Sequence, residues 1–240
     1  MDGTALFYDE AGSGDAVLFI HEFAGNHRTW SAQMAALGTS HRCVAYAARG
    51  YPPSDVPESD AAYGQDISVA DAIAVLDALN IERAHIVGHS MGAYTALHVG
   101  LRHPERCLSV AALGCGWGSH PDERETARGL CEDIAAMFRE KPIAESAAAY
   151  ARFPMRNTFE ANLKKFAPPL LVLVGDEDHP CLDGSLFLKR TVPTAALQIV
   201  PRAGHTITME EPAIVNAALN GLFAAATDGT WMNHRKKTNT

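Results

Sequence analysis

Six short, mainly apolar runs are spaced along the chain, each bounded by glycine, proline or polar residues. They cover residues 16–21, 42–46, 84–88, 108–113, 169–175 and 196–200. A continuous apolar run of this length is typical of a strand that is buried on both faces of a sheet. The runs therefore predict the strands of a mostly parallel, buried sheet.

Longer stretches with helical character lie between these runs, at residues 65–79, 91–102 and 212–225. In the first stretch, Val69, Ile73 and Leu76 recur at the spacing of one helix face. The last begins with proline in its first turn, where the missing N–H costs little. Strands that alternate with helices predict an α/β fold with a doubly wound, mostly parallel sheet flanked by helices.

Residues 114–167 interrupt the alternation, because they show no strand pattern and only two helical segments, near residues 124–139 and 143–152. The region is too long for a plain connection. We therefore expect a short helical lid, over residues 114–167, inserted into a core formed by residues 1–113 and 168–226.

Four large apolar residues mark the ends of the expected lid: Trp117, Phe153, Met155 and Phe159. The simpler interpretation is that they pack the lid onto the body of the protein. The alternative is that some of them, with Trp117, Phe153 and Met155 as candidates, bind the acyl part of a substrate.

Composition narrows the class of protein. A chain of 240 residues with 47% hydrophobic and 20% charged residues suits one globular domain. A net charge of -8 argues against a nucleic-acid partner. The five cysteines form no CxxC pair, so neither a disulfide framework nor a structural zinc site is indicated.

The two ends of the chain carry little structural signal. Residues 1–10 lack the pattern of a signal peptide, and no run of about 18 apolar residues exists to span a membrane. We expect a cytoplasmic protein without a membrane partner. Residues 227–240 are polar and end in a basic stretch, which predicts a disordered tail.

The motif that carries chemistry is Gly88-His89-Ser90-Met91-Gly92, which lies between a predicted strand and a predicted helix. Glycines at both ends allow a tight turn that exposes the serine hydroxyl at the start of the helix, where negative charge is favoured. Ser90 is therefore the candidate nucleophile, and the Met91 N–H is a candidate oxyanion donor. The alternative is a purely structural serine turn.

A serine nucleophile needs a base and a group that orients the base. His205 follows the last predicted strand, and Asp178 follows the strand before it. The carboxyl ends of parallel strands share one edge of the sheet, and the order Ser–Asp–His fits this type of site. Asp176 and Glu177 are the rival acids, and His179 is expected to be solvated or to touch the lid.

The second oxyanion donor is expected in the loop after the first buried strand, which reads His21-Glu22-Phe23-Ala24-Gly25. The backbone N–H of Phe23 is the candidate. His21 is expected to support the loop, and His21 and Glu22 are also candidates for substrate contact.

Together these residues resemble the α/β-hydrolase fold superfamily, in the branch of small serine esterases and enol-lactonases. The resemblance runs from about residue 4 to residue 223 and implies no cofactor and no metal. Besides the serine motif, it rests on Arg49-Gly50-Tyr51 with Ser54-Asp55, His103-Pro104-Glu105-Arg106, Gly175-Asp176-Glu177-Asp178, Ala203-Gly204-His205 and Glu210-Glu211-Pro212.

Three departures from the family pattern limit what the resemblance implies. Glu22 stands where family members usually carry glycine, and its carboxylate is expected to face outward, or alternatively to bond the oxyanion loop. Ala47 and Pro52 replace the usual aspartate and glycine around the RGxGxS loop. The expected lid is short, which implies an open pocket and weak selection by substrate length.

The sequence thus predicts an enzyme that cleaves small-molecule carboxylic esters or lactones through an acyl-enzyme, as a monomer or homodimer. Serine at position 90 argues against epoxide hydrolase and haloalkane dehalogenase chemistry, which need a carboxylate nucleophile. Thioester cleavage, C–C bond hydrolysis and perhydrolysis use the same triad and stay open. A non-catalytic ligand-binding protein and an interaction subunit that docks through the lid are the alternatives outside catalysis.

Overall fold

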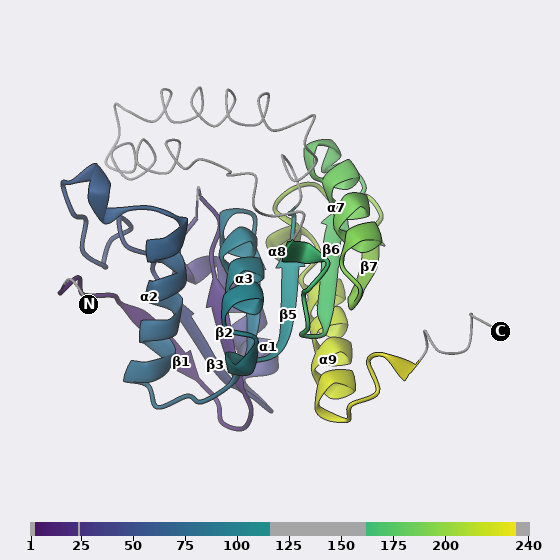
Figure 1. The fold of residues 1–240 in the computed structure, drawn as a ribbon, viewed down its shortest axis with the longest axis horizontal. Helices are drawn as coiled ribbons and strands as arrows, with labels where there is room; N and C mark the ends of the chain where they lie inside the picture. Colours follow the sequence, from purple (N-terminus) through teal and green to yellow (C-terminus); the bar gives the residue numbers. More distant parts are fainter. Residues whose placement is uncertain (1–2, 24, 116–161, 234–240) are drawn as a thin grey trace.

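The computed structural model describes residues 3–23, 25–115 and 162–233, and these form an α/β fold around one sheet (Figure 1). The strand order is β1-β3-β2-β4-β5-β6-β7. Only the β1–β3 pair is antiparallel. The strands are β1 (Tyr8–Ala11), β2 (Ala16–Ile20), β3 (Arg42–Tyr46), β4 (Ala84–His89), β5 (Cys107–Leu113), β6 (Leu170–Gly175) and β7 (Ala195–Val200).

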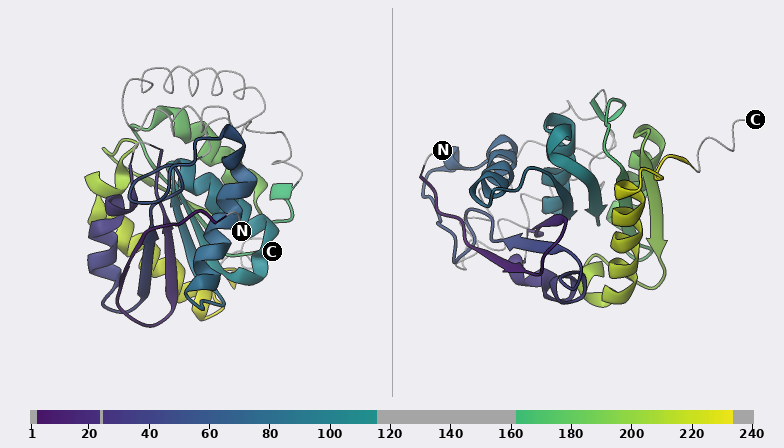
Figure 2. Two further views of the ribbon diagram at one scale, coloured as in Figure 1. Left: turned by 90° about the vertical axis from the view of Figure 1, so that its left-hand side faces the viewer. Right: turned by 90° about the horizontal axis from the view of Figure 1, so that it is seen from below.

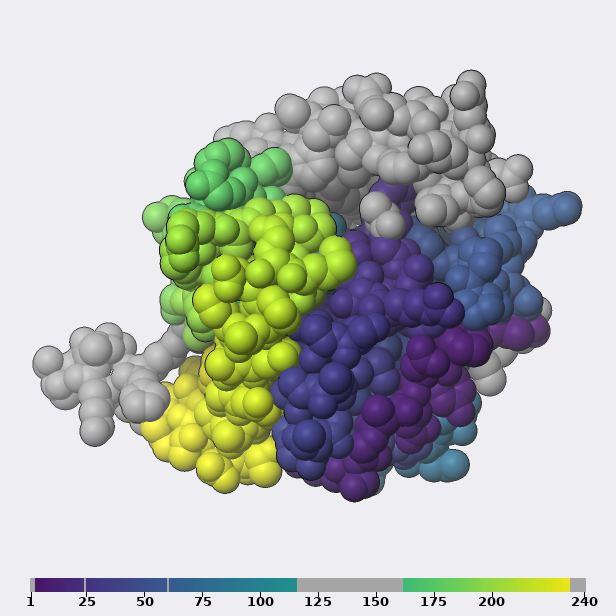
Figure 3. Space-filling view, turned by 180° about the vertical axis from the view of Figure 1, so that it is seen from behind, coloured from purple at the N-terminus to yellow at the C-terminus, as the bar shows by residue number. Residues whose placement is uncertain are grey.

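Helices cover both faces of the sheet (Figure 2). One face carries α2 (Gln65–Ala78), α3 (Met91–Arg102) and α7 (His179–Thr191), and the other carries α1 (Ser31–Leu37) and α9 (Pro212–Thr227). Figure 3 shows α9 beside α1 on that second face, and the two helices are in contact. The short α8 (Ile207–Glu210) precedes α9, and three 3-10 turns complete the described elements: His27–Trp30, Asp60–Ala62 and Pro104–Arg106.

The two helical layers bury two separate apolar clusters because strand side chains alternate between the faces. In β2, Leu18 and Ile20 pack in the cluster under α2 and α3. Val17 and Phe19 pack in the cluster under α1 and α9. Every residue of β2 is buried, which explains why its sequence is continuously apolar.

The six strands expected from the sequence are confirmed, with ends that differ by at most one residue. The three expected helices are confirmed as α2, α3 and α9. Strand β1 was not expected, because this edge strand is mostly exposed and lacks an apolar pattern. Helices α1 and α7 were not expected either: α1 has only seven residues, and the glycine and charged residues of α7 weaken its helical pattern.

Two expected regions fall partly or wholly beyond the described residues. The lid helices and Trp117, Phe153, Met155 and Phe159 lie outside them, and so do residues 234–240. No helix in the described part of the chain is long and apolar enough to cross a membrane.

The disorder expected from residue 227 onward is wrong for the first part of that segment. Helix α9 ends at Thr227, and the chain beyond it returns to the body of the protein. The Trp231 indole N–H donates a hydrogen bond to the Thr194 carbonyl at 2.8 Å and its ring packs against the apolar cluster under α9. One aromatic anchor thus orders residues whose local composition is that of a tail.

The close approach of α3 to β2 depends on two glycines. A side chain on Gly92 would fall on the carbonyl oxygen of Ile20, and one on Gly88 would fall on the carbonyl of Gly92. Because all these atoms belong to the backbone, a methyl group cannot be accommodated by a change of rotamer. The two glycines therefore fix how closely the first turn of α3 sits over the sheet.

We expect Gly92→Ala to lower the free energy of unfolding by about 1–3 kcal/mol or more, since it overpacks backbone against backbone. Gly221→Ala is the matched control, because this glycine lies within α9 and an added methyl group meets no atom within 4 Å. It should raise stability by about 0.5–1 kcal/mol through helix propensity. Urea unfolding of both variants measures the difference, and equal effects would contradict the steric argument.

Candidate active site

Ser90 occupies the sharp turn between β4 and α3. Its φ of 51° and ψ of -115° lie in a region that L-residues rarely adopt. Such a conformation costs about 1–3 kcal/mol and persists only where the surrounding structure enforces it. Here the Ser90 N–H donates to the Leu113 carbonyl at 2.8 Å, which ties the turn to the end of β5. The hydroxyl is left pointing beyond the carboxyl edge of the sheet.

The structure brings His205 and Asp178 to this hydroxyl. His205 Nε2 lies 2.9 Å from Ser90 Oγ, and His205 Nδ1 lies 2.9 Å from Asp178 Oδ2. The aspartate side chain is 3% exposed, whereas the imidazole is 44% exposed and open to a reactant. Because an ionised carboxylate only accepts hydrogen bonds, Nδ1 carries the proton and the Nε2 lone pair faces the serine.

The electrostatics favour a protonated histidine during reaction. The hydrogen bond to Asp178 raises the pKa of His205, against the opposing effect of burial, and the charge of the same carboxylate adds to the rise. The site can therefore hold an imidazolium next to a buried negative charge. The two rival acids have other surroundings: Asp176 accepts from the Ala203 N–H at 3.3 Å, and Glu177 is largely exposed beside His179.

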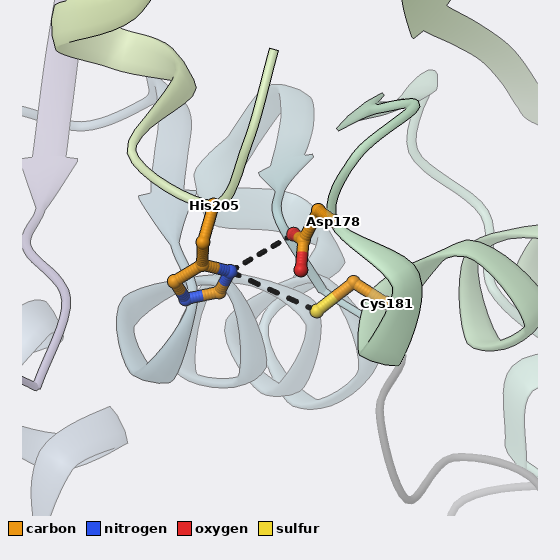
Figure 4. A group of neighbouring side chains, drawn as sticks. All are labelled: Asp178, Cys181 and His205. Atoms are coloured by element: carbon orange, nitrogen blue, oxygen red, sulfur yellow. Dashed lines mark hydrogen bonds and ion pairs between the residues drawn. The ribbon is translucent and has the colours of Figure 1, made fainter.

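A third side chain, Cys181, lies against the same histidine (Figure 4). Its sulfur is 3.9 Å from His205 Nδ1, and its thiol donates to the Gly114 carbonyl at 3.4 Å. The donor atoms of Asp178, Cys181 and His205 lie within 4.8 Å of one another, and all three are zinc ligand types. A metal here would have to displace the Nδ1 proton that orients the imidazole. The scattered cysteines gave no spacing signal from which this neighbour could be found.

The loop after β2 lies beside the serine turn, as expected for the oxyanion side of the site. The Tyr51 hydroxyl donates to the Phe23 carbonyl at 2.8 Å and also lies 3.9 Å from Met91 Sδ. Tyr51 thus connects the residues whose N–H groups are the two candidate oxyanion donors. Its position in the Arg49-Gly50-Tyr51 motif was visible in the sequence, but its contact with both donor residues was not.

Arg49, the arginine of the Arg49-Gly50-Tyr51 motif, has a structural role. Arg49 makes a two-pronged ion pair with Asp71 of α2, with both N–O distances at 2.7 Å and both side chains almost buried. This pairing holds the loop after β3 against α2.

His21 and Glu22 are both buried, and the substrate contact expected of them stays a prediction. His21 is fully buried; its Nδ1–H donates to the Glu22 carbonyl at 2.7 Å and its Nε2 accepts from the Ala48 N–H at 3.0 Å. Burial lowers the pKa of His21 to about 4, so the ring is neutral. It supports the loop, as expected.

The expectation that the Glu22 carboxylate faces outward is wrong. The residue is 7% exposed, and its side chain turns inward, where it accepts from the Thr29 hydroxyl at 2.9 Å and lies 3.3 Å from His89 Nδ1. Gly25 makes room for it, because a side chain at that position would overlap the carboxylate. The glutamate in place of the family's glycine thus creates a polar group within the loop itself.

The loop that carries His205 is held on both sides of the residue. Glu210 accepts from the Gly204 N–H at 2.5 Å and from the N–H and hydroxyl of Thr206. These bonds lower the pKa of Glu210, with the Thr206 hydroxyl as the largest contribution. On the inner side, His89 Nε2 donates to the carbonyl of His205 itself at 2.7 Å.

Comparison with known proteins identifies the family. The family model for the alpha/beta hydrolase fold matches residues 15–161. A 2-hydroxymuconate semialdehyde hydrolase from Pseudomonas sp. (strain CF600) is 30% identical, with 91% of this chain and 90% of the relative aligned. A 3-oxoadipate enol-lactonase from Acinetobacter baylyi is 35% identical over 50% of this chain and 47% of its own.

The solved structure of Est816, described as an N-acyl homoserine lactone degrading enzyme, superimposes with a TM-score of 0.73. It is 27% identical, and the match covers 92% of this chain and 98% of Est816. The family model spans more than half of the sequence, and the first relative aligns over nearly all of it. The chain therefore belongs to the alpha/beta hydrolase fold family.

Proposed function

We propose that the protein is a serine hydrolase that cleaves carboxylic esters or lactones through an acyl-enzyme. The observation that carries the proposal is the continuous chain of hydrogen bonds from Ser90 Oγ through His205 to Asp178, with 2.9 Å at each step. It combines an activated hydroxyl, an accessible base and a buried acid that orients the base.

In the first half of the reaction, His205 Nε2 removes the proton of Ser90 as Oγ attacks the substrate carbonyl carbon. The carbonyl oxygen becomes an oxyanion, for which the N–H groups of Met91 and Phe23 are the candidate donors. Asp178 stabilises the imidazolium. When the C–O bond of the ester breaks, His205 returns the proton to the leaving alkoxide, and the acyl group stays on Ser90.

In the second half, His205 removes a proton from water, and the hydroxide attacks the acyl-enzyme. Ser90 leaves as the alcohol after it takes the proton back from the histidine, and the carboxylic acid is released. With a lactone, the leaving alcohol is part of the acyl chain, so one hydroxy acid is the only product.

The choice of esters and lactones is supported by two relatives whose names specify lactones, an enol-lactonase and an N-acyl homoserine lactone degrading enzyme. The second candidate is C–C bond hydrolysis of a keto acid or semialdehyde, favoured by the alignment of 91% of this chain with a 2-hydroxymuconate semialdehyde hydrolase. Thioester cleavage uses the same groups. A substrate panel with a short ester, a homoserine lactone, a thioester and 2-hydroxymuconate semialdehyde separates these reactions.

We expect Ser90→Ala to abolish hydrolysis of a short p-nitrophenyl ester, with a loss of up to about a millionfold as seen when a triad nucleophile is removed from a serine protease. Ser31→Ala, on α1, is the matched control, because its hydroxyl bonds only the nearby Arg28 carbonyl. A phosphonate probe followed by mass spectrometry should label Ser90 in the wild type. Equal rates for the wild type and Ser90→Ala would refute the serine mechanism.

The rate should also depend on pH through His205, which acts as a base only when it is neutral. Because the pKa of His205 is raised, kcat/KM should be retained above that pKa and lost as the pH falls through it. Asp178→Asn removes the charge that raises the pKa, so the acid limb should move to lower pH. The rate maximum should fall by about 10⁴-fold, since an amide favours the wrong imidazole tautomer.

Asp176→Asn is the control for this experiment, because Asp176 lies two residues away and bonds the Ala203 N–H instead of the histidine. Its pH profile should match that of the wild type. An acid limb that stays in place in Asp178→Asn would mean that another group sets it.

A further inference from the structure

A buried acid–base pair lies directly behind the proposed triad. Glu22, on the loop after β2, and His89, the last residue of β4, approach to 3.3 Å between Oε2 and Nδ1. The His89 side chain is fully buried and that of Glu22 is 9% exposed. Burial of two ionisable groups is costly unless each is paired and hydrogen-bonded. The mechanism above uses neither group, so their presence calls for a function.

The hydrogen-bond partners fix where the protons are. His89 Nε2 faces the carbonyl of His205 at 2.7 Å, and a carbonyl only accepts, so Nε2 carries a proton. On the other side, Nδ1 faces the Glu22 carboxyl group. One more proton must therefore lie between Nδ1 and the carboxylate. Burial acts to raise the pKa of Glu22, but the hydrogen bond and charge of His89 lower it overall.

His89 connects two loops that both belong to the site. Through Nε2 it binds the backbone of His205, and through Nδ1 it binds the residue that precedes Phe23. The Thr29 hydroxyl donates a hydrogen bond to the other carboxylate oxygen of Glu22, Oε1, at 2.9 Å. This second bond restricts rotation of the carboxylate. The rings of His89 and His205 also lie close together, with 5.2 Å between their centroids.

We propose that Glu22 and His89 are positioning residues for His205. The Glu22–His89 pair holds the carbonyl of His205 from inside the protein, while Glu210 holds the two flanking residues, Gly204 and Thr206, from outside. Together they keep Nε2 of His205 within hydrogen-bond distance of Ser90. This inference rests on the proposed serine mechanism for its kinetic consequence. Its structural part, the position of the His205 imidazole, does not depend on which substrate is cleaved.

The decisive comparison is between two buried histidines of the same strand. His89→Leu removes the donor to His205, whereas His85→Leu removes a buried histidine that bonds Ser109 at 2.7 Å near the other end of β4. Misplacement of a reacting group by ~1 Å can cost about a hundredfold. We expect kcat for a p-nitrophenyl ester to fall about 10- to 100-fold in His89→Leu, with KM little changed, and to stay near wild type in His85→Leu.

Conservative variants separate positioning from simple loss of packing. His89→Gln keeps an amide N–H that can reach the His205 carbonyl, and should restore most of kcat. In Glu22→Gln, the amide N–H can donate to His89 Nδ1, and the amide oxygen can still accept from the Thr29 hydroxyl. His89 then keeps its proton on Nε2 for the His205 carbonyl. This variant should therefore also keep most of kcat. Glu22→Leu leaves both Thr29 and His89 without that partner and should lose rate as His89→Leu does.

The low-field NMR signal of the His205 Nδ1 proton provides a readout that needs no substrate. It should be sharp in the wild type and in His85→Leu, and should shift or broaden in His89→Leu. If kcat and the NMR signal are unchanged in His89→Leu, or if both leucine variants lose kcat equally, the positioning proposal is wrong. If no ester is cleaved by the wild type but the signal responds to His89→Leu alone, the proposed function fails and the positioning of His205 stands.

Discussion

The arrangement of the site depends on one backbone constraint, the sharp turn that carries Ser90 between β4 and α3. The serine adopts a positive φ, and the turn is held because α3 packs onto β2 with no side chain at Gly92 between them. A bulkier residue would lift the helix from the sheet, and the hydroxyl would move away from the loops after β6 and β7. The strain of about 1–3 kcal/mol at such a residue is tolerated because the two buried clusters on either side of the sheet fix the flanking elements.

Given this turn, the parallel sheet brings the remaining groups to the serine. Strands β2, β4, β6 and β7 end at the same edge, so four loops that are distant in sequence converge there. Asp178 lies in the loop after β6, directly before α7, and is buried, while His205 stays accessible on the loop after β7. This difference in exposure suits the two residues to different roles. A buried carboxylate keeps a fixed charge and orientation, and an accessible imidazole can exchange protons with a reactant.

Polar groups around His205 also hold the histidine loop in place. Glu210 binds the backbone on both sides of His205, and His89 binds its carbonyl. The bonds to Glu210 are charge-assisted, because its side chain is a carboxylate, and this strengthens them. Without these hydrogen bonds, the imidazole of His205 would occupy a wider range of positions. The 2.9 Å contact between its Nε2 and Ser90 Oγ would then be lost for part of the time.

Local patterns along the chain predict the fold class, six of the strands, Ser90 and His205. Continuous apolar runs reveal buried strands, and the glycines around Ser90 reveal the turn, because both signals are local in the chain. Only the tertiary structure decided between Asp178 and its neighbours, turned Glu22 inward, and brought Cys181 and His89 to His205. Those outcomes depend on contacts between residues far apart in sequence, up to the 116 positions that separate His89 from His205, and no local pattern encodes which side chains such packing brings together.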